Sequence, residues 1–134
     1  MKEIRCFDDL LGETLVAVDK VTRNLDNDDE LRFTLEDGRV FKLFHYQDCC
    51  ESVDIEDIVG NFEDLVGAPL VQAEEVTNAQ DTHPEGGTPP NEYYDDSFTW
   101  TFYKMATTKV YVTIRWFGSS NGYYSESVDF EQVL

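Results

Sequence analysis

Two alternating runs on either side of a glycine turn constrain the fold of this chain most. Apolar residues occupy every second position of Leu31–Leu35, the turn formers Glu36–Gly38 follow, and Phe41–Leu43 resumes the alternation. A period of two predicts half-buried strands, and a glycine in a three-residue connection predicts a hairpin. The register pairs the apolar residues of the two strands and sets Asp29 opposite His45.

Shorter elements are expected on both sides of this hairpin. Residues 14–23 are apolar enough for a strand, and residues 68–76 predict another strand that starts after Pro69. Two helical turns are expected between them. Asp54 caps the first turn, over 55–59, and Asn61 caps the second, over 62–66, which stops at Gly67.

The C-terminal third predicts an antiparallel meander. Phe98, Trp100 and Phe102 alternate on one strand, and we expect the apolar residues of the next two strands to share their face. Those residues are Val110, Val112, Ile114, Trp116, Val128 and Phe130. The fold class is therefore α+β, a mostly antiparallel sheet of about six to seven strands with one or two short helices. Residues 1–134 form a single domain, and the polar segment 77–96 is a mobile insertion or a contact loop.

The formal net charge of −18, from 28 acidic and 10 basic residues, restricts the partners. A field of that sign repels nucleic acid and anionic lipid and speeds encounter with basic protein surfaces. It suits a protein that mimics nucleic acid toward a nucleic-acid-binding partner. Solubility, or adaptation to a salty cytoplasm, explains the same charge without any partner. With 41% hydrophobic and 13% aromatic residues, the chain has the side chains to fold.

Targeting signals are not evident in the sequence. No apolar run approaches the roughly 18 residues of a membrane span, and the N-terminus has no apolar signal core. Three cysteines, two of them adjacent, give no disulfide framework and suit a reducing compartment. We therefore expect a cytoplasmic protein that does not associate with membranes.

One cluster invites chemistry, and its members are His45, Asp48, Cys49, Cys50 and Glu51. Its spacing differs from that of zinc sites, whose thiolates come in separate pairs, so we expect neither a metal nor another cofactor. A cysteine nucleophile with His45 as base and Asp29 as its orienting group is the enzymatic alternative, but no nucleophile motif surrounds either cysteine. Whether the chain is an enzyme stays open, with the balance against it.

Glu126 is expected to point inward, because alternation places it on the same face as Val128. A salt bridge to Lys104 or Arg115 is the structural interpretation, and a binding site is the functional one.

Three blocks of the sequence resemble a known family. They are the segment HYQDCCE at 45–51, WTFYK at 100–104 and SNGYYSE at 120–126. Together they look like a family of uncharacterised bacteriophage and prophage proteins, a resemblance that covers nearly the whole chain and is weakest over 77–96. It implies a phage protein acting inside an infected cell, and it carries no activity.

The resemblance suggests that the loops at 45–51 and 121–126 converge on a ligand. The candidate ligand-binding residues are His45, Tyr46, Asp48, Cys49, Arg115, Asn121, Tyr123, Tyr124 and Glu126. The opposite interpretation is that the two loops lock onto one another as structural corners.

Two functions of different classes follow. The first is a non-enzymatic acidic phage protein that binds and blocks a host protein, a defence or nucleic-acid-handling factor, without binding nucleic acid itself. The alternative is a protein that sequesters a small molecule, a nucleotide or signal, in the loop site.

Overall fold

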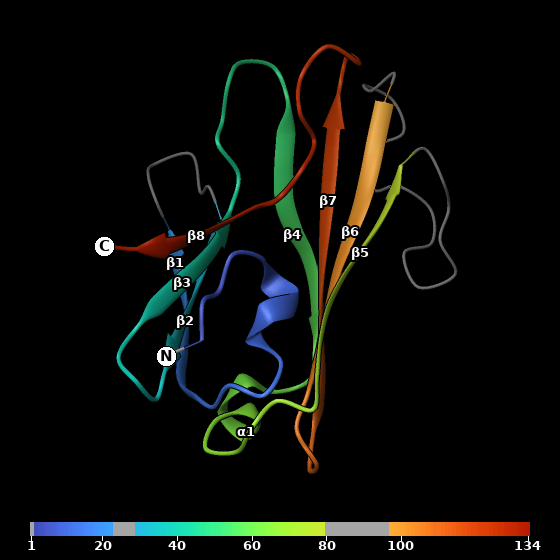
Figure 1. Cartoon of the computed structure of the whole chain (residues 1–134). Coiled ribbons are helices and arrows are strands. Elements are labelled where there is room, and N and C mark those ends of the chain that lie inside the picture. Colours follow the sequence, from blue (N-terminus) through green and yellow to red (C-terminus); the bar gives the residue numbers. More distant parts are fainter. Residues whose placement is uncertain (1, 23–28, 80–96) are drawn as a thin grey trace.

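The structure is a computed structural model that describes residues 2–22, 29–79 and 97–134. Two antiparallel four-stranded sheets face each other in it (Figure 1). The elements, in chain order, are η1 (Phe7–Leu10), β1 (Leu15–Thr22), β2 (Asp29–Leu35), β3 (Val40–Phe44), β4 (Ser52–Val59), α1 (Phe62–Leu65), β5 (Gln72–Ala79), β6 (Ser97–Ala106), β7 (Tyr111–Ser120) and β8 (Asp129–Val133). Within the described residues, the helical elements η1 and α1 have four residues each. The chain is therefore an all-β sandwich, and the predicted α+β class is wrong.

The first sheet has the strand order β1-β2-β3-β8. The β2–β3 hairpin confirms the predicted register, with Leu31 opposite Leu43 and Phe33 opposite Phe41. The last strand departs from the predicted meander. β8 leaves β7 and pairs with β3, with Phe130 opposite Leu43, so the chain crosses from one sheet to the other after residue 120.

The second sheet has the order β4-β7-β6-β5. The helical turn predicted over 55–59 is wrong, because these residues belong to β4 and pair with β7. Ile55 lies opposite Trp116 and Ile58 opposite Ile114, on either side of a register shift between Ile55 and Asp57. The β-branched side chains fit the pleated sheet, and the shift disguises their alternation in the sequence.

The second predicted helical turn is confirmed as α1. The side chain of Asn61 accepts a hydrogen bond from the backbone N–H of Glu63 at 2.8 Å. Gly67 follows with a φ of 91°, a value that a residue with a side chain rarely adopts. The capping residues therefore set this element, although it is only one turn long.

The hydrophobic core lies between the two sheets. Phe33 and Leu43 from the first sheet meet Tyr103 and Trp116 from the second, and all four side chains are fully buried. Phe7 of η1 packs against Tyr103 with ring centroids 4.8 Å apart, so η1 closes the sandwich beside β5.

The sequence analysis assigned the aromatic row of β6 to the wrong face of the sheet. Trp100 lies opposite Phe117, and Phe102 lies opposite Arg115, so the row of Phe98, Trp100 and Phe102 is on the outer face of the second sheet. Alternation correctly placed these residues on one face, but the neighbouring strand turns its Ile114 and Trp116 to the other.

The predicted insertion loop at 77–96 lies outside the described residues from position 80 onward, and its first three residues belong to β5. Across the described ranges, no helix has both the length and the apolar character needed to cross a membrane.

Candidate functional site

The loop between β3 and β4 is built around a buried carboxylate. Glu51 is only 6% exposed, although residues 46–50 before it lie at the surface. Its carboxylate accepts hydrogen bonds from the backbone N–H groups of Asp48 (3.0 Å) and Cys49 (2.9 Å) and from the side-chain amide of Gln47 (3.1 Å). Successive backbone N–H groups that converge on one anion supply positive partial charge without a cation.

His45 links this carboxylate to the segment between β7 and β8. Its Nε2 lies 2.9 Å from a carboxylate oxygen of Glu51, and its Nδ1 lies 2.7 Å from the backbone oxygen of Ser127. Both ring nitrogens therefore have a partner, which fixes the orientation of the ring. The loop before β4 and the segment before β8 therefore meet through the buried His45–Glu51 pair and Ser127; we call this arrangement of residues 45–51 and Ser127 the Glu51 corner.

Hydrogen bonding keeps Glu51 ionised in spite of its burial. Burial is the largest influence and by itself raises the pKa of the carboxyl. The hydrogen bonds from His45 and from the N–H groups of Cys49 and Asp48 act in the opposite direction, and the pKa falls from its usual 4.5 to about 2. A carboxyl with this pKa is poorly matched to general acid–base catalysis near neutral pH. Its evident role is to anchor the loop.

The other predicted loop residues are exposed or half-buried. Tyr46 is 58% exposed and its hydroxyl donates to Glu131. Asn121 accepts a hydrogen bond from the backbone N–H of Tyr123, whose side chain is 89% exposed, and Tyr124 beside it is half-buried. The structure thus places one exposed tyrosine on each loop.

Both carboxylate oxygens of Glu126 accept hydrogen bonds from hydroxyl groups. The sequence predicts a salt bridge to Lys104 or Arg115 instead. Thr99 donates to one oxygen at 2.8 Å and Ser120 to the other at 2.5 Å. Gly118 lies directly beneath it, because a Cβ there would overlap the backbone oxygen of Glu126 and come within 3.0 Å of its Cβ. Glu126 therefore fastens the 121–127 segment onto β6 and β7.

Arg115 lies on the outer face of the second sheet, with the aromatic row. Its guanidinium is 5.6 Å from the ring of Trp100, which in turn packs on Phe117 with centroids 4.7 Å apart. The indole N–H of Trp100 is buried and finds no acceptor among the described residues. The solvent-facing side of an antiparallel sheet is usually polar, so this second aromatic cluster is unusual.

A groove of about 320 Å³ opens on this outer face. Phe102, fully buried, forms its base, while Val59 and Tyr111 are 58% and 48% exposed along its rim. Asp57, Thr113 and Arg115 complete the lining. The volume falls in the range of small-ligand and side-chain pockets, and the lining mixes aromatic, aliphatic and charged groups.

Carboxylates border the groove along β4. Asp54, Glu56 and Asp57 are all exposed. Arg115 pairs with Glu56 and lies 3.7 Å from Asp57, so its positive charge is already compensated. The rim beside the groove therefore keeps a negative potential.

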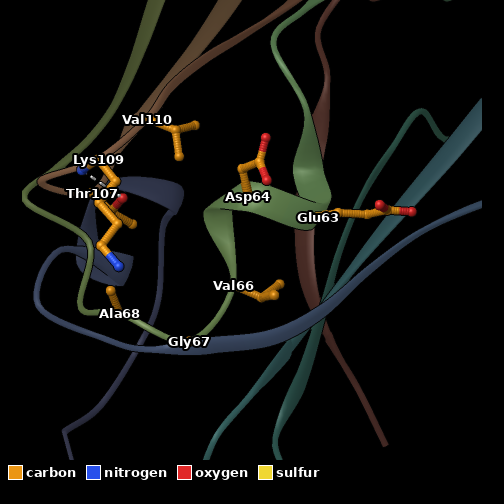
Figure 2. A pocket seen from close by; sticks show the side chains of 8 residues that line it. All are labelled: Glu63, Asp64, Val66, Gly67, Ala68, Thr107, Lys109 and Val110. Carbon is orange, nitrogen blue, oxygen red and sulfur yellow. Dashed lines mark hydrogen bonds between the residues drawn. The ribbon is translucent and has the colours of Figure 1, made fainter.

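A separate concavity of about 400 Å³ lies between α1 and the turn joining β6 to β7 (Figure 2). Figure 2 shows Lys109 on the turn and Asp64 on α1 at opposite sides of it, with Thr107 and Val110 nearby. Lys109 and Asp64 are exposed. Exposed charges stay hydrated and contribute little each, so this concavity is a weaker candidate than the groove.

The cysteines differ from the expectation of no disulfide, because Cys49 and Cys50 are joined to each other and Cys6 is free. A disulfide sulfur is no nucleophile, so the catalytic interpretation lacks its thiolate in this state. Asp29 accepts a hydrogen bond from the backbone N–H of Ile55 at 2.7 Å, and the ring of His45 is oriented by Glu51 and Ser127. Over the described ranges, no three His, Cys, Asp or Glu side chains gather in a way that could hold a metal ion.

The structure divides the predicted ligand set between two surfaces. The predicted residues at 45–49 lie in the Glu51 corner, which contacts the segment before β8 through Ser127, whereas Arg115 makes its contacts with Glu56, Asp57 and Trp100 on the outer face. The predicted set lacks Val59, Phe102 and Tyr111. A signal was present for Phe102, because the adjacent Phe102 and Tyr103 make this part of β6 apolar at both phases of its alternation, which is typical of a strand covered on both faces.

Comparison with known proteins gives one match. Residues 8–130 match the model of a family described as a domain of unknown function, DUF7448. No curated protein and no solved structure matches the chain.

Proposed function

We propose that this chain, which belongs to the DUF7448 family, is a non-enzymatic binding protein whose outer sheet face docks a basic segment of a protein partner. The groove on the second sheet carries the proposal. It combines an aromatic base with an exposed apolar rim beside three carboxylates. Tyrosine and arginine at the centre of a patch, with polar groups around them, are typical of protein interfaces.

Charge defines the chemistry of the partner. Arg115 is compensated by Glu56 and Asp57, and the whole chain carries −18, so an acidic partner would be repelled. A lysine or arginine of the partner can lay its aliphatic stem on Val59 and Tyr111 and place its charge beside the carboxylates of β4. An apolar neighbour of that residue then occupies the groove above Phe102.

The finer proposal places this binding in the cytoplasm of a bacterium infected by a phage. There the protein blocks a host defence or nucleic-acid-handling protein by occupying the basic surface that takes nucleic acid. The acidic charge supports this proposal, and so does the resemblance of the 45–51, 100–104 and 120–126 blocks to phage proteins.

Affinity capture with matched variants tests the proposal. The full chain, its Tyr111→Ala variant and a Glu36→Gln control from the β2–β3 turn are immobilised and exposed to bacterial lysate. We expect one protein that the parent and the control retain, that Tyr111→Ala loses, and that is released as salt rises from about 0.1 to about 1 M. A DNA or RNA duplex should compete with it if the partner's nucleic-acid site is involved. Equal capture by Tyr111→Ala, or capture that salt does not affect, would contradict the docking face.

The loop site is a second proposal, favoured by the hydrogen bond from His45 to Ser127 that joins the two loops. Tyr46 and Tyr123 are the exposed aromatic groups there that could stack on a nucleotide-like ligand. Native mass spectrometry of the protein from infected cells should then show a retained mass of a few hundred daltons, which Tyr123→Ala loses. A clean apo mass would leave the docking face as the sole proposal.

A further inference from the structure

The Cys49–Cys50 disulfide lies in the loop that holds the Glu51 corner. Both cysteines are exposed, so an incoming thiol can reach either sulfur. Accessibility of the sulfur is a main requirement for thiol–disulfide exchange. The free Cys6, also exposed, lies at the start of η1, in a different part of the chain.

The disulfide shares its backbone with the anchor of the corner. The N–H of Cys49 belongs to a residue of the disulfide ring and donates to Glu51 at 2.9 Å, and the N–H of the preceding Asp48 donates at 3.0 Å. Closing the ring restricts backbone rotation between Cys49 and Cys50, directly after the N–H that donates to the carboxylate. Hydrogen bonds connect Glu51 to His45 and His45 to Ser127, so a change in the loop backbone affects all three residues.

We propose that Cys49–Cys50 is a site of thiol–disulfide exchange whose oxidation state controls the order of the Glu51 corner. A thiolate of a small thiol or a protein dithiol attacks one sulfur, the bond between the cysteines breaks, and a mixed disulfide forms while the other cysteine leaves as a thiolate and takes up a proton. A second thiol attacks the mixed disulfide. The products are two cysteine thiols and the disulfide of the reductant, a transfer of two electrons.

Reduction opens the ring and restores backbone freedom at residues 49 and 50. The N–H groups of Asp48 and Cys49 then donate to Glu51 for a smaller fraction of the time. This weakens the buried contact between Glu51 and His45. Because His45 also binds Ser127, the loosening reaches the segment between β7 and β8. The site therefore couples the redox state to both loops, and it does not depend on the proposed docking face.

Alkylation and amide exchange test this site in the full chain. Iodoacetamide should label Cys6 alone in the protein kept free of reductant, and all three cysteines after dithiothreitol. Hydrogen exchange of residues 46–51 should then accelerate by about tenfold or more, with a smaller change at 125–128. A Cys6→Ser variant, which keeps the pair, should respond like the parent.

Two variants separate the coupling from simple loosening of a loop. Cys49→Ser/Cys50→Ser should exchange as the reduced parent does and ignore dithiothreitol. Glu51→Gln should exchange fast while oxidised, and reduction should add little. Labelling of Cys49 or Cys50 in the oxidised protein would overturn the site. Equal exchange in both redox states, or a full response to reduction in Glu51→Gln, would overturn the coupling.

Discussion

Replacing Glu51 with glutamine gives the sharpest test of how this fold is held at its loops. Glutamine keeps the shape of the side chain but removes the charge and turns one acceptor into a donor. The carboxylate accepts from two backbone N–H groups, the amide of Gln47 and the ring of His45, so the new donor faces other donors. Leaving these buried polar groups unpaired predicts a loss of about 2–4 kcal/mol of unfolding free energy at pH 7.

The lowered pKa of Glu51 also predicts how the free energy of unfolding depends on pH. The folded pKa of Glu51, about 2, lies below its usual 4.5, so its contribution is complete above pH 4.5 and disappears as the pH falls toward 2. That difference corresponds to at most about 3 kcal/mol. The gap in stability between the parent and Glu51→Gln should therefore narrow by up to this amount from pH 7 to about pH 2.5.

Urea denaturation followed by tryptophan fluorescence measures both quantities. Protonation of the other carboxyls affects parent and variant alike, so the difference between the two proteins isolates Glu51. Glu36→Gln, an exposed change in the β2–β3 turn, should stay within about 0.5 kcal/mol of the parent. A gap that is independent of pH, or a variant as stable as the parent, would refute the claim that an ionised Glu51 anchors the corner.

Three further substitutions test other parts of the fold. Gly118→Ala forces a Cβ against the backbone of Glu126 and should destabilise the protein by about 1–3 kcal/mol in urea melts; an unchanged melt would mean that the 121–127 segment packs elsewhere. Asn61→Ala removes the cap of α1 and should cost about 1 kcal/mol, whereas Asn61→Asp should restore most of it. Tyr111→Ala should leave the melt within about 0.5 kcal/mol of the parent, so that loss of partner capture can be assigned to the groove; a large drop in stability would make Tyr111 part of the fold.

Local signals predicted the elements that depend on local chemistry. The hairpin register followed from the spacing of apolar residues around Gly38, and α1 followed from Asn61 and Gly67. The turn predicted over 55–59 failed because the register shift near Glu56 breaks the alternation of Ile55 and Ile58. Short apolar segments of this kind satisfy helix and strand patterns equally, and only pairing with β7 decides between them.

Long-range choices could not be predicted from local patterns. The move of β8 from β7 to β3 depends on which exposed edge it covers, and no residue of Asp129–Val133 encodes that edge alone. The Glu51 corner could also be predicted only in part. The sequence showed its residues, but it did not show that His45 contacts Glu51 and Ser127. Asp29, the partner predicted for His45, instead accepts a hydrogen bond from the backbone N–H of Ile55.

The charges on the outer face of the second sheet bear on the proposed binding function. A small sandwich with a charge of −18 repels itself, and part of that repulsion remains in the folded state because the exposed Asp54, Glu56 and Asp57 lie close together on β4, where Arg115 pairs with Glu56 and Asp57. Such carboxylates protect an edge strand from pairing with other chains, which explains their position without a partner. They do not explain why Val59 and Tyr111 lie exposed beside them along the groove. A basic partner would relieve the repulsion and cover the apolar rim at once, so both features favour the same occupant.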